Sequence, residues 1–168
     1  MKKLTNLKIN SKQCGVVLIM FFTIITTSYA FNPVNLKIAQ KTDMYLDSLI
    51  SNPVSSLVLF NDKIYGYGDT PAKLYSDAKS LPLLFQANTL FDNIQLISVK
   101  ISSLSDESIK ISGSQLSNFK NLKYLVFTYE YPSCGNSADE TCLSNKTMDK
   151  LSLIDENLQV LYIMSIPQ

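Results

Sequence analysis

The sequence predicts an α/β fold in which about four parallel strands form one sheet, stacked as a short solenoid behind an N-terminal helix. The first observation is a repeated phrase of Asn, aliphatic, Gln or Lys, any residue, aliphatic, any residue and apolar, which begins at Asn93, Asn121 and Asn157. A looser copy without the asparagine covers residues 54–59. The second observation is that polar, glycine- and proline-containing stretches separate the copies. Such recurrence indicates a stacked unit, because a single unit of this size cannot bury its own apolar face.

The start of the chain has the pattern of an export signal. A lysine-rich segment over 2–12 precedes an apolar run over 15–27, and Ser28 and Ala30 are small residues at the positions that a signal peptidase reads. The run is short for a membrane span, which needs about 20 residues, so we expect cleavage after Ala30, with an uncleaved anchor as the alternative. The sequence therefore predicts a signal peptide over 1–30 and an extracytoplasmic protein, periplasmic or secreted, that meets the membrane only in transit.

Residues 31–168 are expected to form one domain that begins with a helical cap over 31–53. Asn32-Pro33 opens this segment and Asn52-Pro53 ends it. Between them, apolar side chains recur at a spacing that fits a helix. These side chains are Ile38, Tyr45, Leu46 and Leu49.

Four strands and two further helices are expected after the cap. The first strand covers 54–60 and leads into a glycine-rich turn at 65–69. Thr70 followed by Pro71 suits the N-cap and first turn of a helix, which we expect over 70–79. The other strands are expected at 94–101, 122–129 and 158–164, with a short helix near 146–154 before the last of them.

The repeated phrases resemble the leucine-rich repeat consensus. Two segments look like this consensus, namely Val54-x-x-Leu57-x-Leu59-x-x-Asp62-x-Ile64 and Ile94-x-x-Ile97-x-Val99-x-x-Ser102-x-Leu104, and the match is most specific over residues 91–127. The segment Leu116-Ser-Asn-Phe119-Lys-Asn-Leu122 is similar to the lead-in that brings the family's chain back to the next strand. The resemblance, to a short and degenerate array of exported bacterial type, implies a parallel sheet whose concave face binds a protein or peptide.

A compact α/β layer domain with a buried parallel sheet is the alternative architecture. Residues 57–60 and 160–164 are nearly continuous apolar runs, which are typical of parallel strands buried on both faces. The first apolar residues of the four copies are at positions 54, 94, 122 and 158, so only the middle interval, 28 residues, lies in the range of leucine-rich repeats.

Composition excludes several classes of function. Without the predicted signal peptide, 11 lysines face 14 acidic residues and arginine is absent, so we expect no nucleic-acid partner. Histidine is also absent, which removes the usual general base and the commonest zinc ligand. Ser76 and Ser117 each begin a Ser-x-x-Lys sequence, but a chain this rich in serine and lysine contains such matches by chance. We therefore expect no enzymatic activity, no cofactor and no metal site.

Cys134 and Cys142 are expected to form a disulfide. They flank a polar loop and are the only cysteines that remain after removal of the signal peptide. In an exported protein an isolated even pair is typical of a structural bridge, whereas a metal site would need further cysteine or histidine ligands.

One face of the predicted sheet is too apolar to be solvated. Counted from residues 54, 94, 122 and 158, the first, fourth and sixth positions are expected to point into the core, with Leu57, Ile97, Leu125 and Leu161 stacked in one row. The third, fifth and seventh positions then form the opposite, concave face, where eight of the twelve side chains are apolar or tyrosine. These twelve are Ser56, Val58, Phe60, Leu96, Ser98, Lys100, Tyr124, Val126, Thr128, Val160, Tyr162 and Met164.

Two functions would account for this face. The first is a non-enzymatic binding module that holds a protein or peptide partner on the concave sheet. The predicted binding residues are Leu96, Tyr124, Val126, Val160, Tyr162 and Met164. The second is a structural or self-assembling envelope protein whose sheet is covered by its own N-terminal helix or by a second subunit, which leaves a homo-oligomer open.

Overall fold

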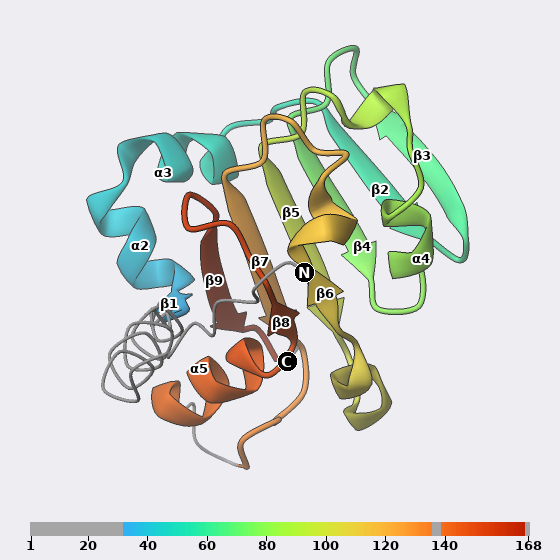
Figure 1. Cartoon of the computed structure of the whole chain (residues 1–168). Helices are drawn as coiled ribbons and strands as arrows, with labels where there is room; N and C mark the ends of the chain where they lie inside the picture. Colours follow the sequence, from blue (N-terminus) through green and yellow to red (C-terminus); the bar gives the residue numbers. More distant parts are fainter. Residues whose placement is uncertain (1–31, 136–138, 167–168) are drawn as a thin grey trace, which may run out of the picture. The chain divides into compact units, whose positions relative to one another are not determined.

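Seven strands form one mostly parallel sheet in the computed structural model, which describes residues 32–135 and 139–166 (Figure 1). In spatial order they are β1 (Val34–Asn35), β9 (Gln159–Met164), β7 (Tyr124–Tyr129), β5 (Leu96–Ile101), β4 (Lys73–Asp77), β2 (Ser56–Phe60) and β3 (Lys63–Tyr67). Every neighbouring pair is parallel except β2 and β3, which form an antiparallel hairpin. The α/β class and the parallel sheet are thus confirmed, while the predicted signal peptide lies outside the described residues.

Strands β2, β4, β5, β7 and β9 follow one another in the sheet in the same order as in the chain. The segments that connect them pack against one face of the sheet (Figure 1). These segments contain α4 (Leu81–Leu84), η1 (Thr89–Phe91), η2 (Leu104–Ser108), η3 (Gly113–Leu116) and α5 (Glu140–Met148), together with a small parallel sheet of β6 (Ile111–Ser112) and β8 (Leu151–Ser152). The other face of the sheet is therefore left to the N-terminal segment.

The predicted N-terminal helical cap consists of two helices, α2 (Leu36–Thr42) and α3 (Met44–Ser51). The side chain of Asn35 caps α2 by accepting the amide N–H of Lys37 at 2.9 Å. The side chain of Asp43 ends the first helix and begins the second, because its carboxylate accepts the amide N–H groups of Tyr45 and Leu46. A side-chain oxygen that satisfies the free amides of a first turn is the usual reason for a helix to start at such a residue.

Two hydrophobic cores result, one on each face of the sheet. The connection core lies between the sheet and the connecting segments, and the helix core lies between the sheet and α2–α3. The buried members of the helix core are Leu36, Ala39, Leu46, Leu49, Leu96, Tyr124, Val126 and Leu161. At β7 and β9, which are largely apolar on both faces, the sheet is the middle layer of a three-layer arrangement.

The helix predicted over 70–79 is wrong, because this segment contains the central strand β4. Leu74 aligns with Leu57 on one side and with Ile97 on the other. The strands of Leu57 and Ile97, which the sequence predicted to be neighbours, are therefore separated by β4. The capping pattern at Thr70 was outweighed by this burial. Lys73 interrupts the apolar pattern of this strand, because a lysine is usually read as an exposed residue. Here it is buried, and its ammonium group donates to the carbonyl of Asn52 at 3.3 Å.

The predicted stacked row is also wrong at its last member. Val160, not Leu161, aligns with Leu125, and Leu161 aligns with Val126 in the helix core. A one-residue shift turns every side chain of a strand to the other face. The sequence pattern does not reveal this register, because the side chains of β9 are apolar on both faces. One face packs against the connection core and the other against α2–α3.

Two boundaries differ as well. The helix predicted near 146–154 is α5, which begins earlier because the Asp139 side chain accepts the amide N–H of Cys142 at 3.1 Å. Part of the predicted glycine-rich turn is strand β3. The actual turn is Asn61-Asp62, whose φ angles of 51° and 57° suit the tight two-residue turn of a hairpin.

Candidate functional site

The six predicted binding residues do not share one face of the sheet. Leu96, Tyr124 and Val126 are buried in the helix core. Val160, Tyr162 and Met164 lie on the opposite side, against the connection core, because of the register of β9. All six except Met164 are buried within the chain itself. The prediction that they form one exposed binding face is therefore wrong.

The N-terminal helices cover the part of the concave face that β7 and β9 form. The Tyr45 ring stacks on the Tyr124 ring with 6.4 Å between centroids, and the Lys123 ammonium lies 4.4 Å from the centre of the Tyr45 ring. The Tyr124 hydroxyl donates to Asp43 at 2.7 Å. Hydrogen bonds from the Leu46 amide and from Tyr124 lower the pKa of the Asp43 carboxyl, and burial together with this carboxylate raises the pKa of Tyr124. Helices α2 and α3 of the same chain therefore cover this half of the face.

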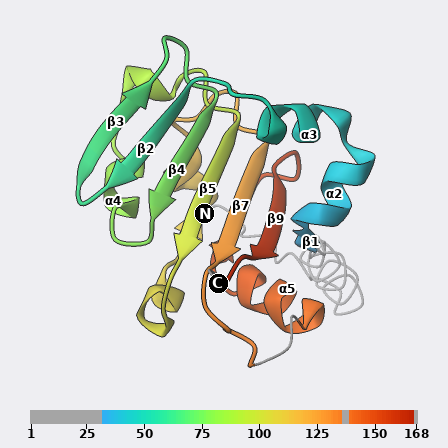
Figure 2. The same ribbon diagram turned by 180° about the vertical axis from the view of Figure 1, so that it is seen from behind.

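The remaining half of the same face is open. In Figure 2 no helix lies in front of β2, β3 and β4. Four aromatic side chains point outward from these strands, since the strand register places them on the same side as Val58. They are Phe60, Tyr65, Tyr67 and Tyr75, exposed by 49%, 43%, 60% and 39%. We refer to these four residues and the hollow beside them as the open face.

The hollow has a volume of about 310 Å³ and lies where β2, β4, β5 and β7 run side by side. Val58, Phe60 and Tyr75 supply its apolar wall. Its polar lining includes Ser98 and Thr128, whose hydroxyl oxygens lie 3.3 Å apart. An ion pair of 3.2 Å between Lys100 and Glu130, together with Asp77, provides the charges. Most of these positions belong to the face that the sequence predicted, whereas Tyr75 was missed because its segment was read as a helix.

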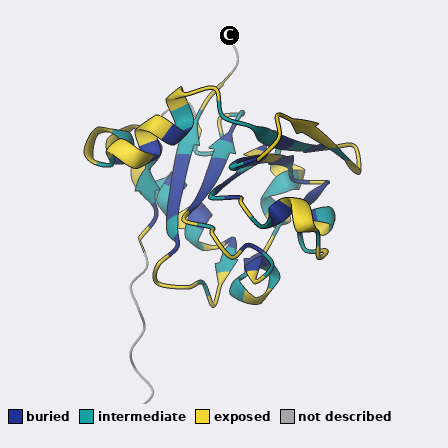
Figure 3. Ribbon diagram, turned by 90° about the horizontal axis from the view of Figure 1, so that it is seen from above, coloured by how far each residue is buried: buried dark blue, intermediate teal, exposed yellow. Residues whose placement is uncertain are grey.

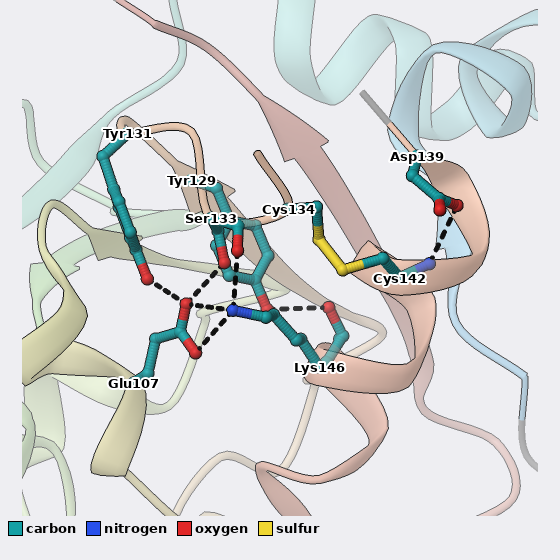
Figure 4. The surroundings of a disulfide bond; sticks show 9 residues. Glu107, Tyr129, Tyr131, Ser133, Cys134, Asp139, Cys142 and Lys146 are labelled. Atoms are coloured by element: carbon teal, nitrogen blue, oxygen red, sulfur yellow. Dashed lines mark hydrogen bonds and ion pairs between the residues drawn. A yellow bond between two sulfur atoms is a disulfide. The ribbon is translucent and has the colours of Figure 1, made fainter. Parts of the chain in front are cut away.

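A second cluster of polar groups surrounds the confirmed disulfide between Cys134 and Cys142 (Figure 4). The Glu107 carboxylate accepts hydrogen bonds from Lys146 at 2.7 and 2.9 Å and from the hydroxyls of Tyr131 and Ser133. Burial alone would raise the pKa of Glu107, but these donors outweigh it and lower the pKa to about 2.

The hydrogen bonds of this cluster connect three segments of the chain. The Ser133 hydroxyl donates to the Glu107 carboxylate, which is a weak base because its pKa is lowered to about 2. Lys146 also donates to the Ser133 carbonyl at 2.7 Å. The group therefore ties η2, the cysteine loop and α5 together, and we assign no binding or catalytic role to it.

Comparison of the chain with protein-family models, with curated proteins and with solved structures finds no match. Within the described ranges, acidic and cysteine side chains do not gather in any group that could hold a metal ion. Every helix in the same ranges is too short or too polar to cross a membrane. The open face and its hollow are therefore the candidate functional site.

Proposed function

We propose that the protein is an exported, non-enzymatic binding module that holds a protein or peptide partner on the open face of its sheet. The observation that carries the proposal is the hollow of about 310 Å³ beside exposed aromatic side chains. Compared with the sequence-based prediction, the function is kept and the site moves along the same face, from β7 and β9 to β2, β4 and β5.

The lining of the hollow suits an anchoring side chain of a partner. Val58 and Tyr75 form an apolar centre, and the Lys100–Glu130 pair and Asp77 form a polar border. Protein interfaces commonly combine an apolar centre with a polar rim, and a few aromatic anchors dominate their binding free energy. Tyrosine suits such a surface because its ring packs against a partner while its hydroxyl tolerates water.

The two Ser-x-x-Lys sequences support a binding role over an enzymatic one. The Ser76 hydroxyl donates to the Asp77 carbonyl at 2.9 Å, and the Ser117 hydroxyl donates to the Ser114 carbonyl at 2.8 Å. Each hydroxyl is thus bonded to the backbone instead of to the lysine that a nucleophilic serine would need.

Export and a repeat-like architecture are parts of the same proposal. The disulfide supports an oxidising compartment, as the predicted signal peptide requires. The resemblance to leucine-rich repeats is supported by parallel strands in chain order and by a row of aligned apolar residues. The row consists of Leu57, Leu74, Ile97, Leu125 and Val160.

The test uses a random-peptide phage library selected on the immobilised protein. Affinities of the selected peptides are then measured by isothermal titration for the unchanged protein, Tyr75→Ala and Tyr67→Ala. Tyr75 lines the hollow, whereas Tyr67 is an exposed tyrosine of the same face outside it. We expect Tyr75→Ala to weaken binding at least fivefold, a loss of about 1 kcal/mol, and Tyr67→Ala, which lies on the open face but outside the hollow, to weaken it less.

Nuclear magnetic resonance locates the bound peptide independently. Selected peptides should shift the amide signals of Val58, Ser98 and Thr128 and leave those of α5 unchanged. If no peptide is selected, or if the selected peptides bind Tyr75→Ala as well as the unchanged protein, the proposal is wrong.

A further inference from the structure

We propose that two copies of the chain pair through their β3 strands, antiparallel, so that the two sheets become one continuous sheet across a two-fold axis. Strand β3 ends the sheet, and among the described residues nothing pairs with its outer side. The inference rests on the geometry of this strand and not on the binding function of the hollow.

The tight turn determines which backbone groups of β3 are free. In a two-residue hairpin the residues that flank the turn exchange both hydrogen bonds, and this arrangement alternates along the pair. Phe60 and Lys63 flank the turn, so Lys63, Tyr65 and Tyr67 direct their backbone groups to β2. Ile64 and Gly66 therefore direct their N–H and C=O groups outward.

The edge is not protected in the ways that usually prevent pairing. Native edge strands carry prolines, bulges or several charges, or lie under a helix. The sequence of β3 is Lys-Ile-Tyr-Gly-Tyr, its pairing with β2 is continuous, and its one charge, Lys63, lies beside the turn. Four of its five residues are exposed, as the hairpin at the right of Figure 3 shows.

The second copy fits this edge because the strand complements itself. With the two-fold axis at Tyr65, Ile64 aligns with Gly66 of the second copy, and these are the residues with outward backbone groups. On the open face, Lys63 then lies beside the Tyr67 ring of the second copy and not beside another lysine. An ammonium group over a tyrosine ring is attractive, so the charges favour this register.

The pairing closes as a dimer and does not grow into a filament. The opposite edge of the sheet is β1, which has two residues and continues directly into α2. It offers too little free backbone for a further copy, and a two-fold contact uses the same surface on both copies. The dimer would also place the two open faces next to each other.

The first test compares Gly66→Pro with Gly66→Ala in the full exported chain by sedimentation equilibrium over a range of concentrations. Proline removes the outward N–H of Gly66, whereas alanine keeps it. A Cβ at this position would lie 3.7 Å from Leu57 Cδ2, an ordinary contact, so alanine is a fair control. We expect the unchanged protein and Gly66→Ala to dimerise and Gly66→Pro to raise the dissociation constant at least tenfold.

The second test does not depend on the folding of the proline variant. In Tyr65→Cys the new thiols of two copies face each other across the axis, within the reach of a disulfide, so oxidation should give a covalent dimer. In Tyr67→Cys each thiol faces position 63 of the other copy, so no covalent dimer should form. A monomer at all concentrations, equal dissociation constants for Gly66→Pro and Gly66→Ala, or equal cross-linking of both cysteine variants would overturn the proposal. None of these outcomes would affect peptide binding in the hollow.

Discussion

Replacement of Tyr124 distinguishes a self-covered sheet from an exposed binding surface. The Tyr124 ring lies in the helix core with only 5% of the residue exposed, between the strands and α3. Its hydroxyl donates to the carboxylate of Asp43, the residue that caps α3. The structure therefore predicts that Tyr124→Ala lowers the free energy of unfolding, whereas an exposed binding residue could be truncated without this effect.

The magnitude follows from the burial and from the hydrogen bond. Truncation of a buried aromatic side chain to alanine costs about 3–5 kcal/mol. At about 3 °C per kcal/mol for a domain of this size, the melting temperature should fall by about 10 °C. Tyr124→Phe keeps the ring and loses only the bond to Asp43. Because Asp43 still accepts the Tyr45 and Leu46 amides and lies near solvent, we expect a loss of about 1 kcal/mol.

The assay is urea unfolding followed by circular dichroism, with thermal melting as a second measurement. Met44→Ala is the control, since Met44 belongs to α3 but is 88% exposed, and its truncation should change the free energy of unfolding by less than about 0.5 kcal/mol. If Tyr124→Ala melts at the same temperature as the unchanged protein, α2–α3 does not hold this face and the reasoning fails.

Two further predictions concern other parts of the chain. Gly68→Ala should destabilise the protein by about 1–3 kcal/mol in urea unfolding, because Gly68 has a φ of 83° and a Cβ there would meet the Ser55 side chain; an unchanged midpoint would contradict this. The pKa of Glu107 is lowered from 4.5 to about 2 in the folded state, so its contribution to stability is present above pH 4.5 and lost as the pH falls toward 2. Glu107→Gln should therefore show a smaller loss of stability between pH 5 and pH 2 than the unchanged protein, and equal losses would refute this assignment.

The strands that carry the repeated phrase could be predicted from the sequence, because each combines an apolar run with flanking polar residues. β2, β5, β7 and β9 lie within the expected segments, and the disulfide followed from an isolated cysteine pair. The positions of Val58, Phe60, Ser98, Lys100 and Thr128 on one face also followed from strand alternation. These features depend on local pattern alone.

The features that were missed depend on tertiary contacts. β4 contains the buried Lys73, which a hydrophobic pattern does not register as a strand position, and Tyr75 of the hollow was lost with it. The register of β9 depends on the apolar surface of α2–α3, since both alternating sets of its side chains are apolar. Without that register, residues of two opposite faces were combined into one predicted site.

The pairing of β1 with β9 joins the first and last strands of the described chain. Val34 and Leu161 lie opposite each other in this pair, although nearly the whole domain separates them in sequence. Strand β1 can therefore pair only after β9, which comes more than a hundred residues later in the chain, is available, and contacts of such long sequence separation slow folding. Until β9 is available, the apolar side of α2–α3 lacks part of its packing surface, so a chain truncated before residue 159 would leave it exposed to proteases and to aggregation.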